Sequence, residues 1–129
     1  MTDRVGQVVR STLLAAVIVA ASGAIARAAE LVMFHSKSCP WCAAWDRDIG
    51  KVYDKTNEAR VLTLRRVDAD RETDGGVKLA RPVEVTPTFV IVACGREVGR
   101  ILGYPGEDHF WGLLGMEIER NRTALAAKC

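Results

Sequence analysis

The order of the first structural elements is set by residues 31–42, which read Leu31-Val32-Met33-Phe34-His35-Ser36-Lys37-Ser38-Cys39-Pro40-Trp41-Cys42. The first four residues form an uncharged apolar run, which is typical of a strand buried on both faces in the middle of a sheet. A polar stretch then ends the run, and the pair Cys39 and Cys42 follows it. The sequence therefore predicts a strand that leads directly into a cysteine pair.

A helix is predicted to lead out of the cysteine pair. From Pro40 to about Tyr53, apolar side chains recur at spacings of three and four with Asp and Arg between them, namely Trp41, Ala44, Trp45, Ile49 and Val52. This is the period of an amphipathic helix. Pro40 suits the first turn because its missing N–H would have no partner there, and Ser38 is a good residue for the cap region. We expect Trp45 to lie in the core.

The remaining chain predicts three more strands and two more helices. Strands are expected at residues 61–67, 88–93 and 98–102, and 88–93 is the strongest because it combines β-branched and aromatic residues without a charge. A short helix is expected at residues 76–80. A closing helix is expected from about Glu107, with one face formed by Phe110, Leu113, Leu114 and Ile118. Strands joined through a helix run parallel and hairpin strands run antiparallel. The predicted fold class is therefore α/β, a mixed four-stranded sheet flanked by helices.

The first 28 residues have the three-part layout of a secretory signal peptide. Two arginines form a basic start, residues 13–21 are apolar, and Ala26-Arg27-Ala28 is an A-x-A cleavage site. The alternative is an uncleaved membrane anchor, but the apolar run is shorter than the ~20 residues that span a bilayer. We therefore expect cleavage after Ala28, which leaves residues 29–129 as one exported domain.

Composition agrees with one domain and argues against two classes of partner. Of 129 residues, 49% are apolar and 26% are charged, as is usual for a globular domain with one core. The chain has 18 basic and 16 acidic residues, and the signal peptide accounts for three arginines and one aspartate, so 15 of each remain. A domain without net charge does not attract nucleic acid or an anionic membrane surface, and neither partner is expected.

A Cys-x-x-Cys pair can be a redox dithiol, half of a zinc site or a haem attachment signal. Haem attachment needs His directly after the second Cys, where this chain has Ala43. A zinc site needs two more ligands at paired spacing, whereas Cys94 and Cys129 are 35 positions apart. We therefore expect no metal and no cofactor. In the redox interpretation, the helix N-terminus favours a thiolate at Cys39, which is the nucleophile, and Cys42 is the resolving thiol.

From residue 29 onward the chain resembles the thioredoxin family. The resemblance rests on Phe34, Cys39-Pro40-Trp41-Cys42, Val85-Thr86-Pro87-Thr88-Phe89, Gly95-Arg96-Glu97-Val98 and Gly103-Tyr104. It implies a thioredoxin-like fold and a cis bond between Thr86 and Pro87. Cis bonds are expected before proline, because the free-energy difference between cis and trans is small there. It also implies that the Thr86 backbone lies against the active-site sulfurs and pairs with an extended substrate segment. Trp41 is a further candidate for substrate contact.

The departures from the family narrow the assignment. Ordinary thioredoxins have Trp before the first Cys and Gly-Pro within the motif, where this chain has Ser38 and Pro40-Trp41. Apolar residues also occupy the first strand, where many thioredoxins carry a buried acid as a proton relay. The stretch between the two motifs has no room for the helical insertion of the DsbA type. The chain therefore resembles small periplasmic thioredoxin-like reductases, including those associated with sulfur oxidation and cytochrome c maturation.

The resemblance implies a monomeric periplasmic thiol–disulfide oxidoreductase that reduces exported cysteine-containing proteins. A disulfide oxidase and a non-catalytic module that holds a thiol-bearing partner remain as alternatives. An oxidising compartment would require a membrane thiol donor to keep Cys39 and Cys42 reduced. Export also permits a structural disulfide between Cys94 and Cys129, because in a thioredoxin fold the closing helix returns toward the hairpin turn. The alternative of a frayed terminal thiol at Cys129 stays open.

Overall fold

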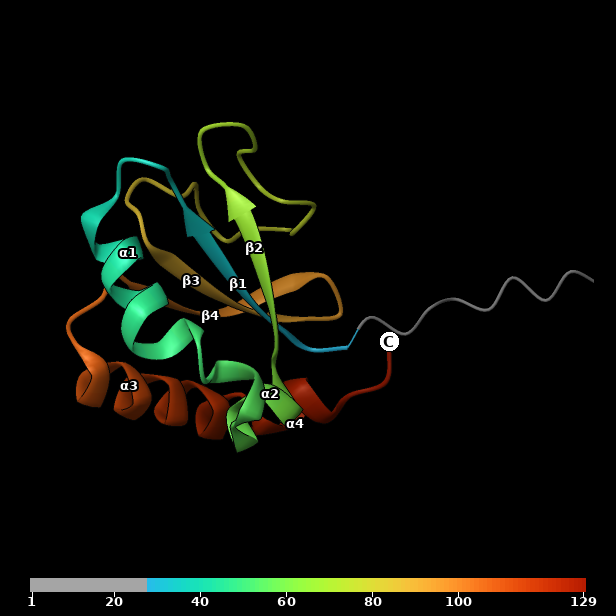
Figure 1. Cartoon of the computed structure of the whole chain (residues 1–129). Helices are drawn as coiled ribbons and strands as arrows, with labels where there is room; N and C mark the ends of the chain where they lie inside the picture. Colours follow the sequence, from blue (N-terminus) through green and yellow to red (C-terminus); the bar gives the residue numbers. More distant parts are fainter. Residues whose placement is uncertain (1–27) are drawn as a thin grey trace, which may run out of the picture.

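The computed structural model describes residues 28–129. The predicted signal peptide lies outside the described residues except for Ala28. Figure 1 shows one central sheet with the helices on one side of it. In chain order the elements are β1 (Glu30–His35), α1 (Pro40–Trp45), a π-helical turn (Asp46–Gly50), a 3-10 turn (Tyr53–Lys55), α2 (Asn57–Val61), β2 (Thr63–Asp68), β3 (Thr88–Ala93), β4 (Arg96–Leu102), α3 (Glu107–Arg120) and α4 (Arg122–Ala126).

The four strands form one mixed sheet in the order β2-β1-β3-β4, which confirms the predicted fold class. β1 runs parallel to β2, while β3 runs antiparallel to both β1 and β4. β1 and β3 occupy the middle because Leu31 to Phe34 of β1 and all of β3 are buried, and all of these residues except Thr88 are apolar. Strands covered on both faces need no alternation of apolar and polar residues.

The two faces of the sheet are covered by different kinds of structure. α1, α2, α3 and α4 pack on one face, around a core that includes Trp45, Phe89 and Phe110 (Figure 1). On the other face, valines of the sheet pack against four side chains of the long segment between β2 and β3, which are Ala69, Val77, Leu79 and Val83. Among the described residues this second face carries no helix.

The short helix predicted at residues 76–80 is absent, so that prediction is wrong. Gly75-Gly76 adopts positive φ angles of 58° and 73°, which suit a turn. The backbone of Lys78 then pairs with the β3–β4 hairpin, since its N–H donates to Gly95 O at 2.9 Å and its carbonyl accepts from Glu97 N–H at 3.1 Å. The hairpin edge thereby supplies the hydrogen bonds that a helix would have made internally.

The helix predicted from Pro40 to about Tyr53 is α-helical only as far as Trp45. It continues as the π-helical turn and ends in the 3-10 turn. Three large side chains four positions apart are nonetheless fully buried, as expected for a core-facing stripe: Trp45, Ile49 and Tyr53. On an α-helix, residues four positions apart are rotated relative to each other around the helix axis. The wider π-helical turn offsets this rotation. Val52, predicted on the same face, is exposed instead.

Two short helices, α2 and α4, have no counterpart among the predicted elements. α2 follows Thr56, whose side chain accepts a hydrogen bond from the Ala59 N–H and caps the helix. Because α2 includes Val61, β2 begins at Thr63 rather than at residue 61. Val61, at the start of the predicted strand, therefore belongs to a capped helical turn, and Leu62 is the C-cap of that turn.

α3 begins at Glu107, as predicted, but its buried face is displaced from the expected one. Leu113 is exposed, whereas Glu117 is buried together with Phe110 and Leu114. The Glu117 carboxylate lies against Gly99 of β4, where an added Cβ would collide with it. The absence of a side chain at Gly99 thus lets a polar residue of α3 approach the sheet.

Candidate active site

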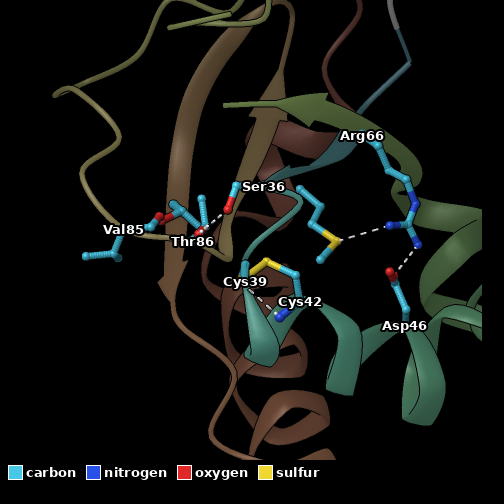
Figure 2. Close-up of a disulfide and its surroundings, with 9 residues drawn as sticks. Ser36, Cys39, Cys42, Asp46, Arg66, Val85 and Thr86 are labelled. Carbon is cyan, nitrogen blue, oxygen red and sulfur yellow. Dashed lines mark hydrogen bonds and ion pairs between the residues drawn. A yellow bond between two sulfur atoms is a disulfide. The ribbon is translucent and has the colours of Figure 1, made fainter. Parts of the chain in front are cut away.

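Cys39 and Cys42 lie where β1 gives way to α1, and a disulfide joins them (Figure 2). Cys39 is the N-cap of α1 and Pro40 occupies the first turn, while Cys42 is a buried residue of the helix. Their Cα atoms are 5.2 Å apart. The Cys42 N–H donates to Cys39 Sγ at 3.1 Å, so this sulfur takes the place that a Ser or Asp oxygen commonly takes at an N-cap.

The position of Cys39 favours a negative charge on its sulfur when the disulfide is opened. The N–H groups of a first helical turn have no partner within the helix, and the helix dipole is positive at this end. Cysteine thiols at helix N-termini lose their proton more readily for this reason. The arrangement can therefore exchange disulfides, with the nucleophile at the outer end of the helix.

The two cysteines differ less in exposure than the sequence argument expects. The relative exposure is 8% for Cys39 and 4% for Cys42, so neither is a freely exposed surface residue. The difference between them is one of position on the helix rather than of burial. Trp41, between them, is 63% exposed and is accessible to a partner.

The loop before β3 contains the second predicted motif, and its Thr86–Pro87 bond is cis. The buried Thr88 hydroxyl donates to the Val85 carbonyl at 2.6 Å. On the other side of the cis bond, the Pro87 carbonyl accepts from the Gly103 N–H at 2.8 Å. Both ends of the loop are thus held by hydrogen bonds within the chain.

The same loop approaches the segment between β1 and α1. The hydroxyl oxygens of Ser36 and Thr86 lie 3.4 Å apart, within hydrogen-bonding distance (Figure 2). Within residues 28–129, the backbone N–H and C=O of Thr86 take part in no hydrogen bond. Val85 beside it is 49% exposed. A free backbone next to exposed apolar side chains is the arrangement to which an extended peptide can add as a strand.

A hydrogen bond connects the π-helical turn after α1 to the loop after β4. Tyr104 Oη donates to Asp48 Oδ2 at 3.0 Å. Burial, and then the hydrogen bond and the charge of Asp48, raise the pKa of Tyr104 to about 12. Since the neighbouring Gly103 binds the Pro87 carbonyl, the Tyr104 loop contacts both parts of the site. Nothing in the sequence pattern indicated this contact.

An ion pair lies one helical turn beyond Cys42. Arg66 Nη2 of β2 is 2.6 Å from Asp46 Oδ1, and the guanidinium lies over the Trp45 ring, 5.5 Å from its centroid. Arg66 Nη1 also contacts the sulfur of buried Met33 at 3.8 Å. Figure 2 shows Arg66 and Asp46 on the opposite side of the disulfide from Ser36 and Thr86. The spacing of four from Cys42 to Asp46 was the one signal available in the sequence.

A family model described as a thioredoxin-like domain matches residues 17–116. The chain belongs to the thioredoxin-like family. A crystal structure of the periplasmic thioredoxin SoxS from Paracoccus pantotrophus, in its reduced form, is 42% identical in sequence. It superimposes with a TM-score of 0.68, and the match covers 71% of this chain and 97% of that one.

The crystal structure of the Malassezia sympodialis thioredoxin Mala s 13 matches this thioredoxin-like chain at 19% identity and a TM-score of 0.51. That match covers 69% of this chain and 74% of the other, and it shows a shared fold alone. A comparison with curated proteins returned no match. No helix within residues 28–129 has the length and apolar content to cross a bilayer.

A second disulfide joins Cys94 to Cys129 at the opposite end of β3 from the cis bond. Cys94 lies in the β3–β4 turn with a φ of 50°, and the Cα atoms of the pair are 5.4 Å apart. The tertiary structure therefore places α4 where the chain end can reach the turn. This thioredoxin-like chain thus separates its two disulfides by the length of a strand, and the Cys39–Cys42 pair follows the end of β1 that pairs with Thr88, directly after the cis bond.

The acidic loop after β2 forms turns. Asp68 Oδ1 accepts from the Asp70 N–H at 3.0 Å, and Asp74 Oδ1 accepts from the Gly76 N–H at 2.9 Å. In the described part of this thioredoxin-like chain, no group of three His, Cys, Asp or Glu residues is placed to hold a metal ion. His35 ends β1 and is half-buried.

Proposed function

We propose that this chain is a periplasmic thiol–disulfide oxidoreductase that reduces disulfides in exported proteins through Cys39 and Cys42. The observation that carries the proposal is the disulfide at the start of α1, in which Cys39 Sγ accepts the Cys42 N–H at 3.1 Å. A sulfur that already accepts a hydrogen bond from a helix N-terminus is well placed to carry negative charge. The cis bond between Thr86 and Pro87 in the adjacent loop supports a role in binding an extended partner segment.

In the proposed reaction, the Cys39 thiolate attacks one sulfur of a substrate disulfide. A bond forms between Cys39 and that sulfur, and the other substrate sulfur leaves as a thiolate that takes up a proton. The Cys42 thiol then loses its proton to solvent and attacks Cys39 Sγ. The Cys39–Cys42 disulfide forms while the mixed disulfide breaks, and the second substrate thiolate is protonated. Two electrons pass from the dithiol to the substrate.

The proposed compartment and partners follow from the N-terminus and from a similar protein. Residues 1–28 have the composition of a signal peptide, and the 42% identical SoxS is described as a periplasmic thioredoxin. If cleavage follows Ala28, the intact mass of the exported protein should correspond to a chain that begins at Ala29. A membrane-bound species that retains Met1 would instead support an uncleaved anchor. A dithiol that reduces substrates in an oxidising compartment must itself be reduced, so we infer a membrane thiol donor.

Reduction of insulin by the exported protein, with dithiothreitol as electron source, tests the proposed activity. The wild-type protein should precipitate the insulin B chain much faster than the Cys39→Ser variant. The Cys94→Ser/Cys129→Ser variant is the matched control and should retain activity. A wild-type rate equal to that of Cys39→Ser would refute the proposal and favour a module that binds thiol-bearing partners without turnover.

The direction of net electron flow separates a reductase from a disulfide oxidase. Equilibration of the protein with glutathione of known redox poise measures the reduction potential of the Cys39–Cys42 pair. A reductase should have a potential near the low end of the range of the family, about −270 mV, whereas an oxidase should lie near −120 mV. A value in the oxidising range would overturn the reductase assignment and leave disulfide exchange itself intact.

A further inference from the structure

We propose that the Asp46–Arg66 ion pair sets the reactivity of the resolving thiol Cys42, with Arg66 favouring its thiolate and Asp46 opposing it. The inference rests on the proposed function, because a resolving thiol is meaningful only in an exchange reaction. Asp46 and Arg66 act through their charges and contact no substrate, so both are positioning residues.

The location of Asp46 follows from the helix. Its backbone N–H donates to the Cys42 carbonyl, so the two residues are one turn apart. Side chains four apart on a helix are neighbours on one face. Asp46 therefore follows Cys42 one turn later along the helix, and Figure 2 shows its carboxylate directed toward Arg66.

The location of Arg66 is fixed by three separate contacts. Its Nη2 lies 2.6 Å from Asp46 Oδ1, its guanidinium lies over Trp45 at 5.5 Å, and its Nη1 lies 3.8 Å from Met33 Sδ. In the parallel pairing of β1 and β2, Met33 is the register partner of Arg66. Met33 and Trp45 are fully buried and belong to the same core cluster as Cys42. The cation is thus held against two buried residues of the core cluster to which Cys42 also belongs.

The two charges act in opposite directions on a thiolate. A nearby cation stabilises the charged form of an acidic group and a nearby anion destabilises it. Both side chains are partly exposed, 39% for Arg66 and 47% for Asp46, so solvent and salt weaken the effect. The apolar core beneath them has a lower dielectric constant than water and therefore screens their charges less. The rate at which Cys42 reacts should therefore depend on the balance of the pair.

The other titratable groups on the elements that meet at Cys42 are few. His35 ends β1 and Lys37 follows it in the loop to α1. Beyond Asp46, the helix continues with Arg47 and Asp48, which form an ion pair of 3.6 Å with each other. Asp48 also accepts from Tyr104. Among these groups, only Asp46 lies one turn from Cys42 and bonds to a residue of β2.

Alkylation of Cys42 tests the inference directly. In a Cys39→Ser background, the rate of reaction with iodoacetamide at a series of pH values reports the thiolate fraction of Cys42. Arg66→Gln should slow the reaction at pH 7 about twofold, and Asp46→Asn should accelerate it by a similar factor. The variant with both changes should react near the original rate. At 1 M NaCl both effects should shrink, because the screening length falls to about 3 Å.

Arg65→Gln is the matched control, because Arg65 neighbours Arg66 on β2 but pairs with Glu30 at 3.0 Å. It should leave the rate unchanged, and Arg66→Lys, which keeps the charge, should largely preserve it. Loss of structure would change both single variants in the same direction, so equal signs or unchanged rates would overturn the inference. The alkylation rates do not depend on turnover, so absent insulin reduction would refute the proposed function separately.

Discussion

Arg100 Nε lies 2.7 Å from Glu97 Oε1 on the edge strand β4, and the same two side chains hold the segment that leads to the cis bond. The Arg100 guanidinium donates to the carbonyls of Arg81 and Pro82 at 2.7 and 3.0 Å. Glu97 Oε2 accepts from the Ala80 N–H at 2.7 Å. Residues 80–82 belong to no helix or strand, but these hydrogen bonds hold them in place. They lead into the loop that contains the Thr86–Pro87 cis bond.

The pH dependence of stability tests this anchor. Burial alone would raise the pKa of Glu97, but hydrogen bonds from Arg100 and Ala80 and the charges of Arg100 and Arg81 lower it overall. A carboxyl whose folded pKa lies below its unfolded value, about 4.3, stabilises the fold above that pH. This contribution is lost as the pH falls through the folded pKa. Glu97→Gln should therefore be less stable than wild type at pH 7 in urea unfolding, and the difference should shrink toward pH 3.

Glu84→Gln, which removes an exposed carboxylate of the same segment, is the matched control and should leave the free energy of unfolding at pH 7 unchanged. Parallel pH profiles for wild type and Glu97→Gln would contradict the role of the Glu97–Arg100 pair.

Tyr104→Phe should destabilise the fold by about 1–2 kcal/mol, because the Asp48 carboxylate loses its hydrogen bond. The pKa of Tyr104 is raised to about 12, above the unfolded value of about 10. A raised pKa means that the contribution is complete below about pH 10 and is lost between about pH 10 and 12. Urea unfolding at several pH values should show the two proteins converging in that range. A constant difference up to pH 12 would argue that the lost contact is not this hydrogen bond.

The two active-site cysteines should behave differently in trapping. Cys42→Ala retains the nucleophile and lacks the resolving thiol, so it should accumulate mixed disulfides with its natural partners, whereas Cys39→Ala should not. Gel shifts that collapse on addition of reductant report these complexes, and mass spectrometry identifies the captured proteins. The small difference in exposure, 8% against 4%, makes the helix position of Cys39 the cause of the asymmetry. Equal trapping by both variants would show that the roles of nucleophile and resolving thiol are assigned wrongly.

Thr86→Arg in the Cys42→Ala background should weaken trapping severalfold. The Thr86 backbone is the group that we expect to pair with an extended partner, and a long charged side chain beside Ser36 and Val85 would obstruct that approach. Thr73→Arg is the control, because Thr73 is an exposed residue in the segment before the loop that contains Thr86 and Pro87. Undiminished trapping by the Thr86 variant would place the partner elsewhere.

Removal of the second disulfide should affect stability and leave insulin reduction unchanged. The Cys94–Cys129 bridge spans 35 positions, and the chain-entropy estimate for such a loop is about 3–4 kcal/mol. The Cys94→Ser/Cys129→Ser variant should lose stability of this order in urea unfolding under oxidising conditions. A loss of activity at 25 °C with the fold intact would show that this bridge contributes to more than stability.

The central architecture could be predicted because it depends on local patterns. The apolar runs of β1 and β3 required no knowledge of their neighbours, since strands covered on both faces consist of near-continuous apolar runs. The start of α1 followed from Pro40 and from the order Cys39, then Cys42. The start of α3 at Glu107 followed in the same way from the helical period of the closing segment.

The covering of the second sheet face could not be predicted, because its segment folds against partners distant in sequence. The pattern at residues 76–80 permitted a helix, but Lys78 instead pairs with the β3–β4 hairpin. The change of winding after Trp45 likewise depends on core packing, since it keeps Ile49 and Tyr53 buried together. Tertiary contacts decide such cases because intrinsic helix propensity differs by less than about 1 kcal/mol between most residues.

By itself, therefore, the sequence determined the strand, the cysteine pair and the helix that follows it, because these depend on residue type and spacing over a single element. The resemblance of its motifs to the thioredoxin family also implied a role for Thr86 and Pro87 beside the cysteine pair. Only the tertiary structure decided which charges accompany the site, since Arg66 reaches Asp46 across 20 positions and Tyr104 reaches Asp48 across 56. Side-chain contacts of this kind depend on the relative positions of packed elements, which no local pattern specifies.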